Sequence, residues 1–373
     1  MSPRSGRASS GTPVAEVEAA AYTIPTDAPE ADGTLSWDST TLILARVTAG
    51  GVTGTGWTYA TPAAALVIRE TLADVVKGTD IDDVPGTSQA MIRAVRNAGR
   101  PGLVSEAISA VDVALWDLKS RLLGLPLHRL IGAIREEVPL YGSGGFTTYD
   151  DARLTEQVEG WLGMGMGQVK IKIAEGWGAR VGRDLERMRQ VRRIIGDGRA
   201  LFVDANGGYT RKQAVRVMEQ ADDLDVAWFE EPVSSDDLAG LRAVRRAVSA
   251  DVAAGEYGYD LAYFAKMCQA EAVDCLQADV SRCGGITEWV RVAAVAASHG
   301  LDISGHCAPH VHAHVAATVP NLRHLEWFHD HVRIEAMAFD GVLEPRNGRL
   351  HLGAEPGLGL TWRDSDMAPY RVA

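Results

Sequence analysis

Three acidic residues recur at equal intervals in the second half of the chain. Short apolar runs end at Asp204 in LFVDAN, at Glu230 in AWFEEP and at Glu256 in AAGE, which are 26 residues apart (230−204 and 256−230). A strand, a loop, a helix and a return loop together take up roughly this many residues, so the spacing predicts successive βα units. Because equal units place their strand ends at one level of a parallel barrel, the three carboxylates are expected to converge.

Eight short apolar runs extend this repeat through residues 133–340. They occupy residues 138–141, 169–173, 201–203, 226–229, 252–254, 275–278, 301–303 and 325–328. Apolar strands that alternate with helices are typical of a parallel sheet covered on both faces, and eight such strands favour closure into a TIM barrel of the α/β class. The alternative is an open doubly wound sheet, which is disfavoured because no GxGxxG motif opens a first βα unit.

Residues 14–132 show a different pattern, which predicts a separate α+β domain. Strands are expected at residues 14–22 and 40–47. Between them, residues 26–36 are rich in Pro, Asp and Gly and are expected to form a loop. The segment GGVTGTG at residues 50–56 is expected to form a turn before a further short strand.

One helix near the end of this domain has a clear apolar stripe. Its apolar residues recur at steps of three and four: Ile108, Val111, Leu115, Leu118 and Leu122. Gly124 and Pro126 then predict its end. Outside the two domains, we expect a disordered polar segment at residues 1–13 and a carboxyl-terminal segment at residues 341–373 that returns to the α+β domain.

The composition excludes several classes of function. With a formal net charge of −12, the chain lacks the basic face that binds nucleic acid. No apolar run approaches the length of about 20 residues that spans a membrane, and the first residues lack the apolar core of a signal peptide. The four cysteines have no CxxC spacing, which indicates reduced thiols and disfavours a zinc site built from cysteines. We therefore predict a cytoplasmic protein that binds neither nucleic acid nor membrane.

Two lysines end the second predicted barrel strand. Side chains alternate along a strand, so Lys170 and Lys172 in VKIK point to the same face, and their apolar neighbours place this face in the barrel interior. Two ammonium groups so close repel each other, which is expected to lower the pKa of at least one lysine and suit it to act as a base. The alternative is a solvated, charged strand end.

The three regularly spaced acids predict a magnesium site. Asp204, Glu230 and Glu256 offer hard oxygen donors, the ligand type that Mg²⁺ prefers, and we expect one ion per active site. Any one of these acids alone is equally well explained as a structural carboxylate. Asn206 and Glu231, which lie close by in the sequence, are candidates to hold a metal-bound water or a neighbouring lysine.

Later strand ends supply a candidate acid or base. Asp279 ends the sixth predicted strand and His306 the seventh, so adjacent strands would offer a carboxylate to the imidazole. Such a partner selects one tautomer and stabilises the imidazolium, whereas the alternative is that backbone groups satisfy each residue separately. Glu326 adds a further carboxyl group at the eighth strand.

An HxHxH run follows at His310, His312 and His314. If Pro309 begins a helix, residues two apart do not share a face, which disfavours a second metal site. We expect instead that one of these histidines lines the substrate pocket.

In this order and spacing, the motifs resemble the enolase superfamily, mandelate racemase subgroup (the mandelate racemase/muconate lactonizing enzyme family). The resemblance covers nearly the whole chain, from the amino-terminal domain through ISAVDVALWDLKSRLLGLPLHRLIG, VKIK, VDANGGY, WFEEP, AAGE, ADVSRCGGIT and SGHC to PGLG. It implies a modified (β/α)7β TIM barrel beneath an α+β capping domain, with loops at residues 26–36 and 50–59 closing the pocket.

The resemblance also implies a role for each motif. It implies magnesium on Asp204, Glu230 and Glu256, Lys172 as a base on one face of the substrate, the His306–Asp279 dyad on the opposite face, and Lys170, Asn206 and Glu326 as substrate contacts. A protonated Glu326 would add a hydrogen-bond donor.

The implied chemistry is removal of the proton α to a carboxylate through an enediolate. Dehydration of a sugar acid to a 2-keto-3-deoxy acid, a hydro-lyase reaction, is favoured because such enzymes dominate the subgroup. A racemase or epimerase of a 2-hydroxy acid is the alternative. More distant alternatives are a Schiff-base aldolase that uses Lys172 and a non-catalytic metal-binding or scaffold role. The expected partners are a small-molecule carboxylate and further copies of the chain in a homo-oligomer.

Overall fold

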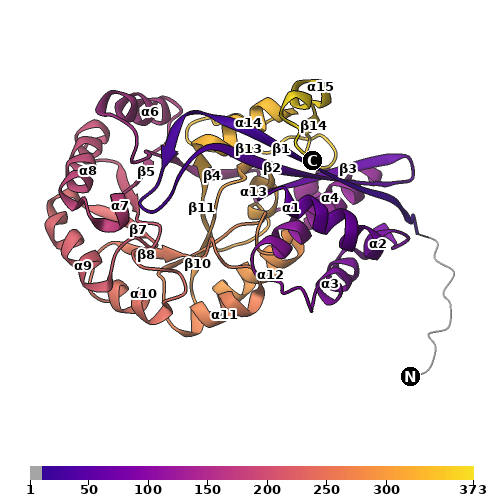
Figure 1. Cartoon of the computed structure of the whole chain (residues 1–373), viewed down its shortest axis with the longest axis horizontal. Helices are drawn as coiled ribbons and strands as arrows, with labels where there is room; N and C mark the ends of the chain where they lie inside the picture. The colour runs from indigo at the N-terminus through magenta and orange to yellow at the C-terminus, as the bar shows by residue number, and fades with distance from the viewer. Residues whose placement is uncertain (1–10) are drawn as a thin grey trace.

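The computed structural model describes residues 11–373, which form a barrel and a smaller domain beside it (Figure 1). The prediction of disorder at residues 1–13 lies outside the described residues except at residues 11–13, where Pro13 forms a β-bridge with Asp80. Within residues 11–373, every helix is too short or too polar to traverse a lipid bilayer.

Eight parallel strands close into the barrel in the order in which they occur along the chain. They are β4 (Glu137–Gly144), β5 (Gln168–Lys172), β6 (Ala200–Asp204), β7 (Val226–Glu230), β8 (Asp251–Ala254), β9 (Cys275–Ala278), β10 (Asp302–Gly305) and β11 (Leu322–Phe328). Parallel pairing of β11 with β4 closes the ring. Each predicted strand and the TIM-barrel class are confirmed.

Helices cover the outside of the barrel. They are α6 (Asp151–Gly163), α7 (Glu175–Gly178), α8 (Val181–Ile195), α9 (Arg211–Gln220), η3 (Asp222–Leu224), α10 (Leu238–Arg245), α11 (Leu261–Gln269), α12 (Gly285–Ser298), α13 (Pro309–Ala316) and α14 (His329–Ala338). The carboxylates of Asp150, Asp237 and Asp260 accept backbone hydrogen bonds at the starts of α6, α10 and α11, which fixes where these helices begin. Their apolar faces pack on the strands to form the main core.

Aromatic side chains fill the barrel below the strand ends. Phe202 and Trp228 stack with ring centroids 5.4 Å apart, and Tyr141 lies against both. Because side chains alternate along a strand, Phe202 and Trp228 point to the same interior as Asp204 and Glu230, two residues later. This aromatic layer therefore fills the barrel interior directly below Asp204 and Glu230.

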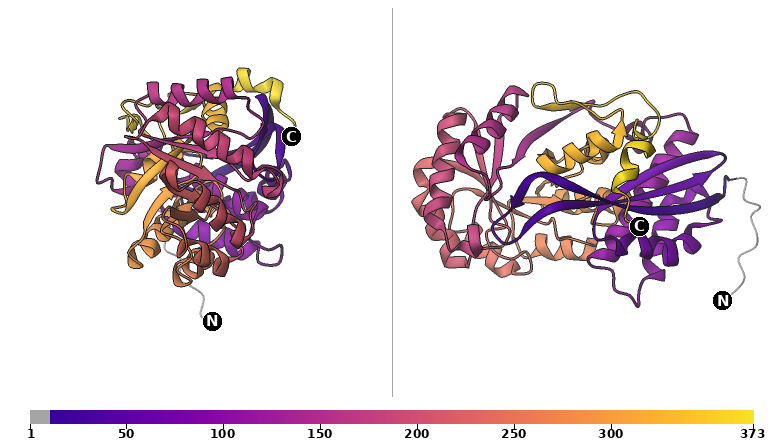
Figure 2. Two further views of the ribbon diagram at one scale, coloured as in Figure 1. Left: turned by 90° about the vertical axis from the view of Figure 1, so that its left-hand side faces the viewer. Right: turned by 45° about the horizontal axis from the view of Figure 1, so that its top comes forward.

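The smaller domain caps the barrel, as predicted. It holds β1 (Val14–Ala31), β2 (Ser36–Ala49), β3 (Val52–Tyr59), α1 (Ala63–Val67), η1 (Ile68–Leu72), α2 (Ala73–Val76), η2 (Ile81–Asp83), α3 (Val84–Ala94), α4 (Leu103–Leu122) and α5 (Leu127–Ile131). Helix α4 is the predicted helix with the apolar stripe, and it packs on the antiparallel sheet. Figure 2 shows β1 and β2 extending from this domain across the barrel as a long hairpin.

This hairpin is longer than the sequence predicts. The expected loop at residues 26–36 is reduced to a turn at residues 32–35, because Glu30 and Trp37 still pair across the hairpin. The Trp37 indole donates a hydrogen bond to the buried Glu30 carboxylate at 2.8 Å. Asp32 closes the turn by accepting hydrogen bonds from two backbone N–H groups.

The predicted turn at residues 50–56 is also wrong beyond its first two residues. Gly54 and Gly56 lie inside β3 and face α4. A Cβ atom added at Gly54 or Gly56 would come within 2.3 or 2.2 Å of a backbone oxygen of α4. These glycines therefore permit close packing of the sheet on the helix, and they do not mark a turn.

The carboxyl-terminal segment contacts both domains. It holds β12 (Phe339–Asp340), β13 (Arg349–His351), β14 (Thr361–Trp362), α15 (Asp364–Met367) and η4 (Ala368–Tyr370). Strand β13 pairs with β4 of the barrel, β12 pairs with β14, and the Val372 N–H donates to the carbonyl of Ala21 in β1 at 2.8 Å.

Candidate functional site

The predicted metal ligands converge at the strand ends. Asp204 and Glu230 lie opposite each other in the pairing of β6 with β7, and Glu256 follows β8 by two residues. One carboxylate oxygen of each lies within 4.8 Å of the others, and all three residues are buried. Three hard oxygen donors so close together fit a divalent cation such as Mg²⁺. The regular spacing in the sequence thus corresponds to one cluster in space.

Like charges crowd this cluster. Burial raises the pKa of Glu230 to about 7 against the opposing effect of the Lys170 ammonium, and Asp204, Glu326 and Glu256 add to the rise. A divalent cation between the carboxylates would compensate this charge, which is a second reason why the donor set fits one.

Both lysines of VKIK point into the barrel, as predicted. Lys170 donates a hydrogen bond to Glu230 and Lys172 donates one to Asp204, each at 2.5 Å. The expected decrease of a lysine pKa is wrong for this arrangement. Burial favours the neutral amine of Lys172, but the Asp204 carboxylate counters it and the pKa lies above its ordinary value. The carboxylates between the two ammonium groups outweigh their mutual repulsion.

His306 and Asp279 form the predicted pair. His306 Nδ1 lies 2.7 Å from Asp279 Oδ2, and the backbone N–H and hydroxyl of Ser281 hold the other Asp279 oxygen. His306 Nε2 lies 3.1 Å from Glu256 Oε2. Burial lowers the pKa of His306, but the neighbouring sulfur and carboxylates raise it well above its ordinary value, which favours the imidazolium.

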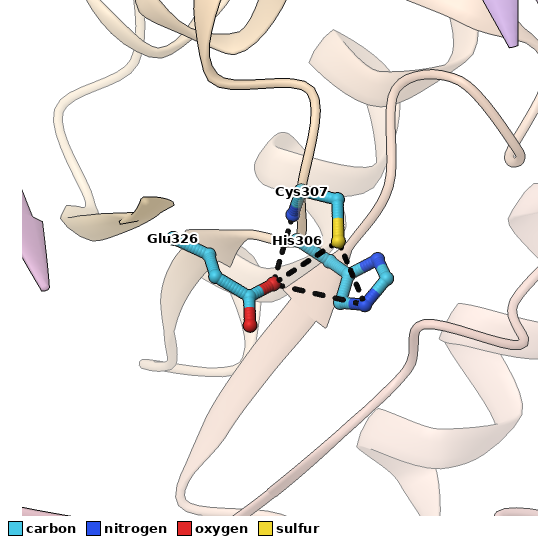
Figure 3. Close-up of side chains that lie close together, drawn as sticks. All are labelled: His306, Cys307 and Glu326. Atoms are coloured by element: carbon cyan, nitrogen blue, oxygen red, sulfur yellow. Dashed lines mark hydrogen bonds and ion pairs between the residues drawn. The ribbon is translucent and has the colours of Figure 1, made fainter. Parts of the chain in front are cut away.

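Glu326 lies between the lysines and the histidine, and Figure 3 shows it pointing toward His306 and Cys307. Its Oε1 lies 2.8 Å from Lys170 Nζ and accepts a hydrogen bond from the Ser143 hydroxyl at 2.6 Å. The expectation of a protonated Glu326 is wrong. Burial would raise the pKa of this carboxyl, but the Lys170 ammonium and the cations beyond it hold the pKa well below its usual range.

A cavity of about 400 Å³ lies between the strand ends and the capping domain. The barrel contributes Lys172, Asn206, Glu256 and His306 to its wall. From the expected closing loops at residues 26–36 and 50–59, Asp32 and Tyr59 line the cavity. The capping domain also contributes residues of β2 and the segment from Ala60 to Pro62, which were not predicted. The wall does not include Lys170 and Glu326, which are fully buried, so their contact with the substrate stays a prediction.

Arg282, Tyr257 and His331 are among the residues of the cavity wall that were not predicted. Arg282 lies 3.5 Å from both Glu256 Oε1 and Asp279 Oδ2, and Tyr257 lies beside it. His331 stacks on Tyr59 with ring centroids 3.4 Å apart. Arg282 could have been found from the sequence, because it lies three residues after the strand-end residue Asp279. No sequence pattern indicates His331, because its place in the wall depends on how the capping domain docks.

The HxHxH histidines do not reach the cavity. His310 Nδ1 pairs with Glu335, His312 Nδ1 lies 2.7 Å from Cys307 O, and His314 Nε2 lies 3.2 Å from Leu358 O. The prediction that one of them lines the substrate pocket is therefore wrong. Alternate residues of α13 point in different directions, and each histidine is buried against a separate partner.

Comparison with known proteins agrees with this geometry. Residues 16–132 match the family model described as mandelate racemase / muconate lactonizing enzyme, N-terminal domain, and residues 153–366 match the one described as enolase C-terminal domain-like. An L-talarate/galactarate dehydratase of Salmonella typhimurium is 31% identical over 318 residues, which cover 83% of this chain and 77% of that protein.

Solved structures are similar over almost all of the chain. A mandelate racemase/muconate lactonizing enzyme-like protein from Rubrobacter xylanophilus is 46% identical with a TM-score of 0.93, over 96% of this chain and 100% of that one. A racemase from Streptomyces coelicolor A3(2) with bound magnesium is 28% identical with a TM-score of 0.91, also over 96% and 100%. Both domains of the chain match, and it therefore belongs to the mandelate racemase/muconate lactonizing enzyme family of the enolase superfamily.

Proposed function

We propose that this protein removes the proton α to a carboxylate, with Mg²⁺ as its cofactor, and dehydrates a sugar acid to a 2-keto-3-deoxy acid. The observation that carries the proposal is that two proton-transfer groups adjoin one carboxylate cluster. Lys172 contacts Asp204, His306 contacts Glu256, and both side chains line the same cavity. A substrate held at the cluster is within reach of an amine and an imidazole.

Asp204, Glu230 and Glu256 are the residues that would bind the Mg²⁺ cofactor. Mg²⁺ held there would supply positive charge that stabilises a carboxylate losing its α-proton. The buried, like-charged donor set supports this assignment, as does the magnesium in the S. coelicolor relative. The Lys170 ammonium and the Trp228 indole N–H each hold one oxygen of Glu230, which fixes the orientation of this ligand.

Lys172 is assigned to accept the α-proton. This step requires the neutral amine, whereas the Asp204 carboxylate raises the pKa of Lys172 above its ordinary value. A cation bound to Asp204 would compensate the carboxylate charge that causes this rise. The His306 imidazolium, stabilised by Asp279, then donates a proton to the β-hydroxyl group. The carbon–oxygen bond breaks, water leaves, and the resulting enol gains a proton at carbon 3 to give the keto acid.

The wall of the cavity supports a polyhydroxylated substrate. Polar side chains of the capping domain line the cavity, among them Asp32, Thr40 and Thr61. Such groups exchange hydrogen bonds with substrate hydroxyls and fix the orientation of a ligand. The S. typhimurium relative, a dehydratase, supports the same class of reaction.

Racemisation or epimerisation of a 2-hydroxy acid is the second candidate. It is favoured by the presence of two proton-transfer groups, because His306 would then return a proton to the carbon from which Lys172 removed one. The S. coelicolor relative is a racemase.

The test is to incubate the protein and Mg²⁺ with a panel of mono- and dicarboxylic sugar acids in deuterated water. Formation of a keto acid is the expected result. Exchange and inversion at the α-carbon without keto acid would identify a racemase instead. Lys172→Ala and His306→Asn should each abolish keto acid formation, whereas borohydride trapping of a substrate on Lys172 without Mg²⁺ would identify a Schiff-base aldolase.

A further inference from the structure

A second cluster of metal-binding side chains lies beside the three carboxylates. His306 Nε2, Cys307 Sγ and Glu326 Oε2 lie within 4.8 Å of one another, and all three residues are buried. Figure 3 shows these side chains pointing toward one another, with His306 and Cys307 just beyond the end of β10 and Glu326 in β11. The cluster combines nitrogen, sulfur and oxygen, so its chemistry differs from that of the cluster made only of carboxylates.

The distances between these atoms match the coordination sphere of zinc. Cys307 Sγ lies 3.3 Å from His306 Nε2 and 3.5 Å from Glu326 Oε2, and Nε2 lies 3.7 Å from Oε2. In tetrahedral zinc the Zn–S bond is about 2.3 Å and the Zn–N and Zn–O bonds are about 2.0 Å. The sulfur therefore lies about 3.5 Å from a nitrogen or oxygen ligand atom, and the nitrogen lies about 3.3 Å from the oxygen. The three atoms thus already lie near three corners of a zinc tetrahedron.

The surroundings of the cluster orient its members. Asp279 Oδ2 lies 2.7 Å from His306 Nδ1, so Nε2 points the other way, where it lies 3.1 Å from Glu256 Oε2 and 3.3 Å from Cys307 Sγ. A carboxylate that holds the far nitrogen of a ligating histidine is typical of zinc sites. Ser143 and Lys170 hold Glu326 Oε1, and the backbone N–H of Cys307 donates to Oε2 at 2.9 Å, which places Oε2 on the side of the sulfur.

We propose that His306, Cys307 and Glu326 bind Zn²⁺ or a similarly thiophilic ion, and that the bound ion inhibits the enzyme because it occupies His306 Nε2. The thiol proton of Cys307 and any proton on Nε2 are released to solvent when the ion binds. The site uses a single cysteine, so it differs from the cysteine-rich zinc site that the sequence disfavours. His306 and Cys307 line the cavity, which gives the ion a route from solvent. Soft sulfur is a poor ligand for Mg²⁺, so the two clusters select different ions.

The direct test is to titrate the protein with Cd²⁺, a thiophilic probe, in excess Mg²⁺ that fills the carboxylate cluster. The expected result is an ultraviolet thiolate-to-cadmium charge-transfer band that saturates at one ion per chain. Cys307→Ser should lose this band. Cys268→Ser, which removes a buried thiol in α11 outside the cluster, should keep it. A band that persists in Cys307→Ser would overturn the proposal.

Zinc affinity supplies the second measurement, by competition with a chromophoric chelator in excess Mg²⁺. Loss of a residue that only orients a ligating histidine weakens metal binding by about 10- to 100-fold, so loss of the sulfur ligand should weaken Zn²⁺ binding by at least about 10-fold. Inhibition of turnover by Zn²⁺ should weaken in parallel. Equal zinc affinity of wild type and Cys307→Ser would show that zinc binds elsewhere, and the proposal would fail.

Glu326→Gln provides the same test if Cys307→Ser does not fold, as judged by circular dichroism. It should keep the thiolate band and lose zinc affinity, and unchanged affinity would contradict the site. The cadmium band and the zinc affinity report metal binding alone. They therefore decide this proposal even if the substrate is not a sugar acid.

Discussion

In this site, one side chain of a pair sets the orientation or the charge of the other. Asp279 is the clearest case, because it lies outside the cavity wall and contacts His306. Its carboxylate selects the imidazole tautomer and stabilises the charged ring, and Ser281 in turn holds the carboxylate. On the proposed function, the reactivity of the histidine therefore depends on residues that lie outside the cavity wall.

Replacing Asp279 tests this dependence. Asp279→Asn keeps the shape of the side chain but stabilises the wrong tautomer, and kcat is expected to fall by about 10³- to 10⁴-fold with little change in KM. Steady-state kinetics at saturating Mg²⁺ measure both constants. Asp274→Asn is the matched control. Asp274 directly precedes β9, at the end of the strand away from Asp279, so this substitution should leave kcat unchanged. Comparable losses in the two variants would contradict a specific role for Asp279.

Stability at acidic pH should depend on buried histidines. Burial, with a smaller effect of His128, lowers the pKa of His314 from 6.5 to about 3. The unfolded chain therefore binds the proton first, so the stabilisation present above pH 6.5 is lost as the pH falls toward 3. One pKa unit corresponds to about 1.4 kcal/mol, so the free energy of unfolding should fall by a few kcal/mol over this window. Urea denaturation at a series of pH values measures it.

His314→Gln is the matched variant, because glutamine does not titrate and its amide is able to donate to Leu358 O as the histidine does. The free energy of unfolding of this variant should depend less steeply on pH. Equal slopes for the two proteins would assign the acid sensitivity to other groups.

Among the elements, the β1–β2 hairpin joins the capping domain to the barrel. Its tip docks through backbone contacts: the Trp177 N–H donates to Gly33 O and the Thr147 N–H donates to Ala31 O, each at 2.8 Å. A Cβ atom at Gly33 would lie 2.5 Å from Ile173 O. The tip therefore fits the loop after β5 only without a side chain at this position.

Gly33→Ala should displace the hairpin tip. Because residues of this hairpin form one wall of the cavity, we expect KM for the substrate to rise several-fold while Mg²⁺ affinity stays the same. Steady-state kinetics and magnesium titration measure the two quantities. Gly160→Ala, in α6, is the control, because a Cβ atom there meets nothing within 4 Å. An unchanged KM in Gly33→Ala would show that the tip does not shape the site.

The elements also show how far the sequence predicts this structure. The barrel strands and α4 were predictable because local apolar runs report burial directly, and Asp204 and Glu230 follow from such runs. The length of the hairpin was not predictable, because Trp37 stabilises Glu30 across the turn and no local sequence pattern reports this contact. Gly54 was misassigned because a turn and a close packing contact both require glycine. His331 could not be found, since its place in the cavity wall depends on docking of the two domains.

For the whole molecule, the barrel supplies the charged groups and the capping domain closes the space above them. The homo-oligomer stays a prediction. Filling the carboxylate cluster should also stabilise the fold, because the unfolded chain does not gather Asp204, Glu230 and Glu256 in one place.

Mg²⁺ is therefore expected to raise the melting temperature. An ion at 100 times its dissociation constant adds about 2.7 kcal/mol to the free energy of unfolding, and a chelator should remove this gain. Calorimetry with Mg²⁺ and with EDTA measures the difference. Glu256→Gln, which keeps the size of the ligand and removes its charge, should respond less to Mg²⁺. The same melting temperature with and without the ion would contradict a metal site of this affinity.

The pairing of β11 with β4, which closes the barrel, affects the order in which the protein folds. Glu326 in β11 is held by Ser143 in β4 and by Lys170 in β5, so its contacts cross the point where the last barrel strand meets the first. Pairings so distant in sequence form late, because a long loop must close before they contribute any stability. A chain that has assembled only its earlier strands has a lysine pair and metal ligands but no Glu326 between them. On the proposed function, the reaction centre is thus completed in the same event as the barrel, and a partly folded chain is expected to be inactive.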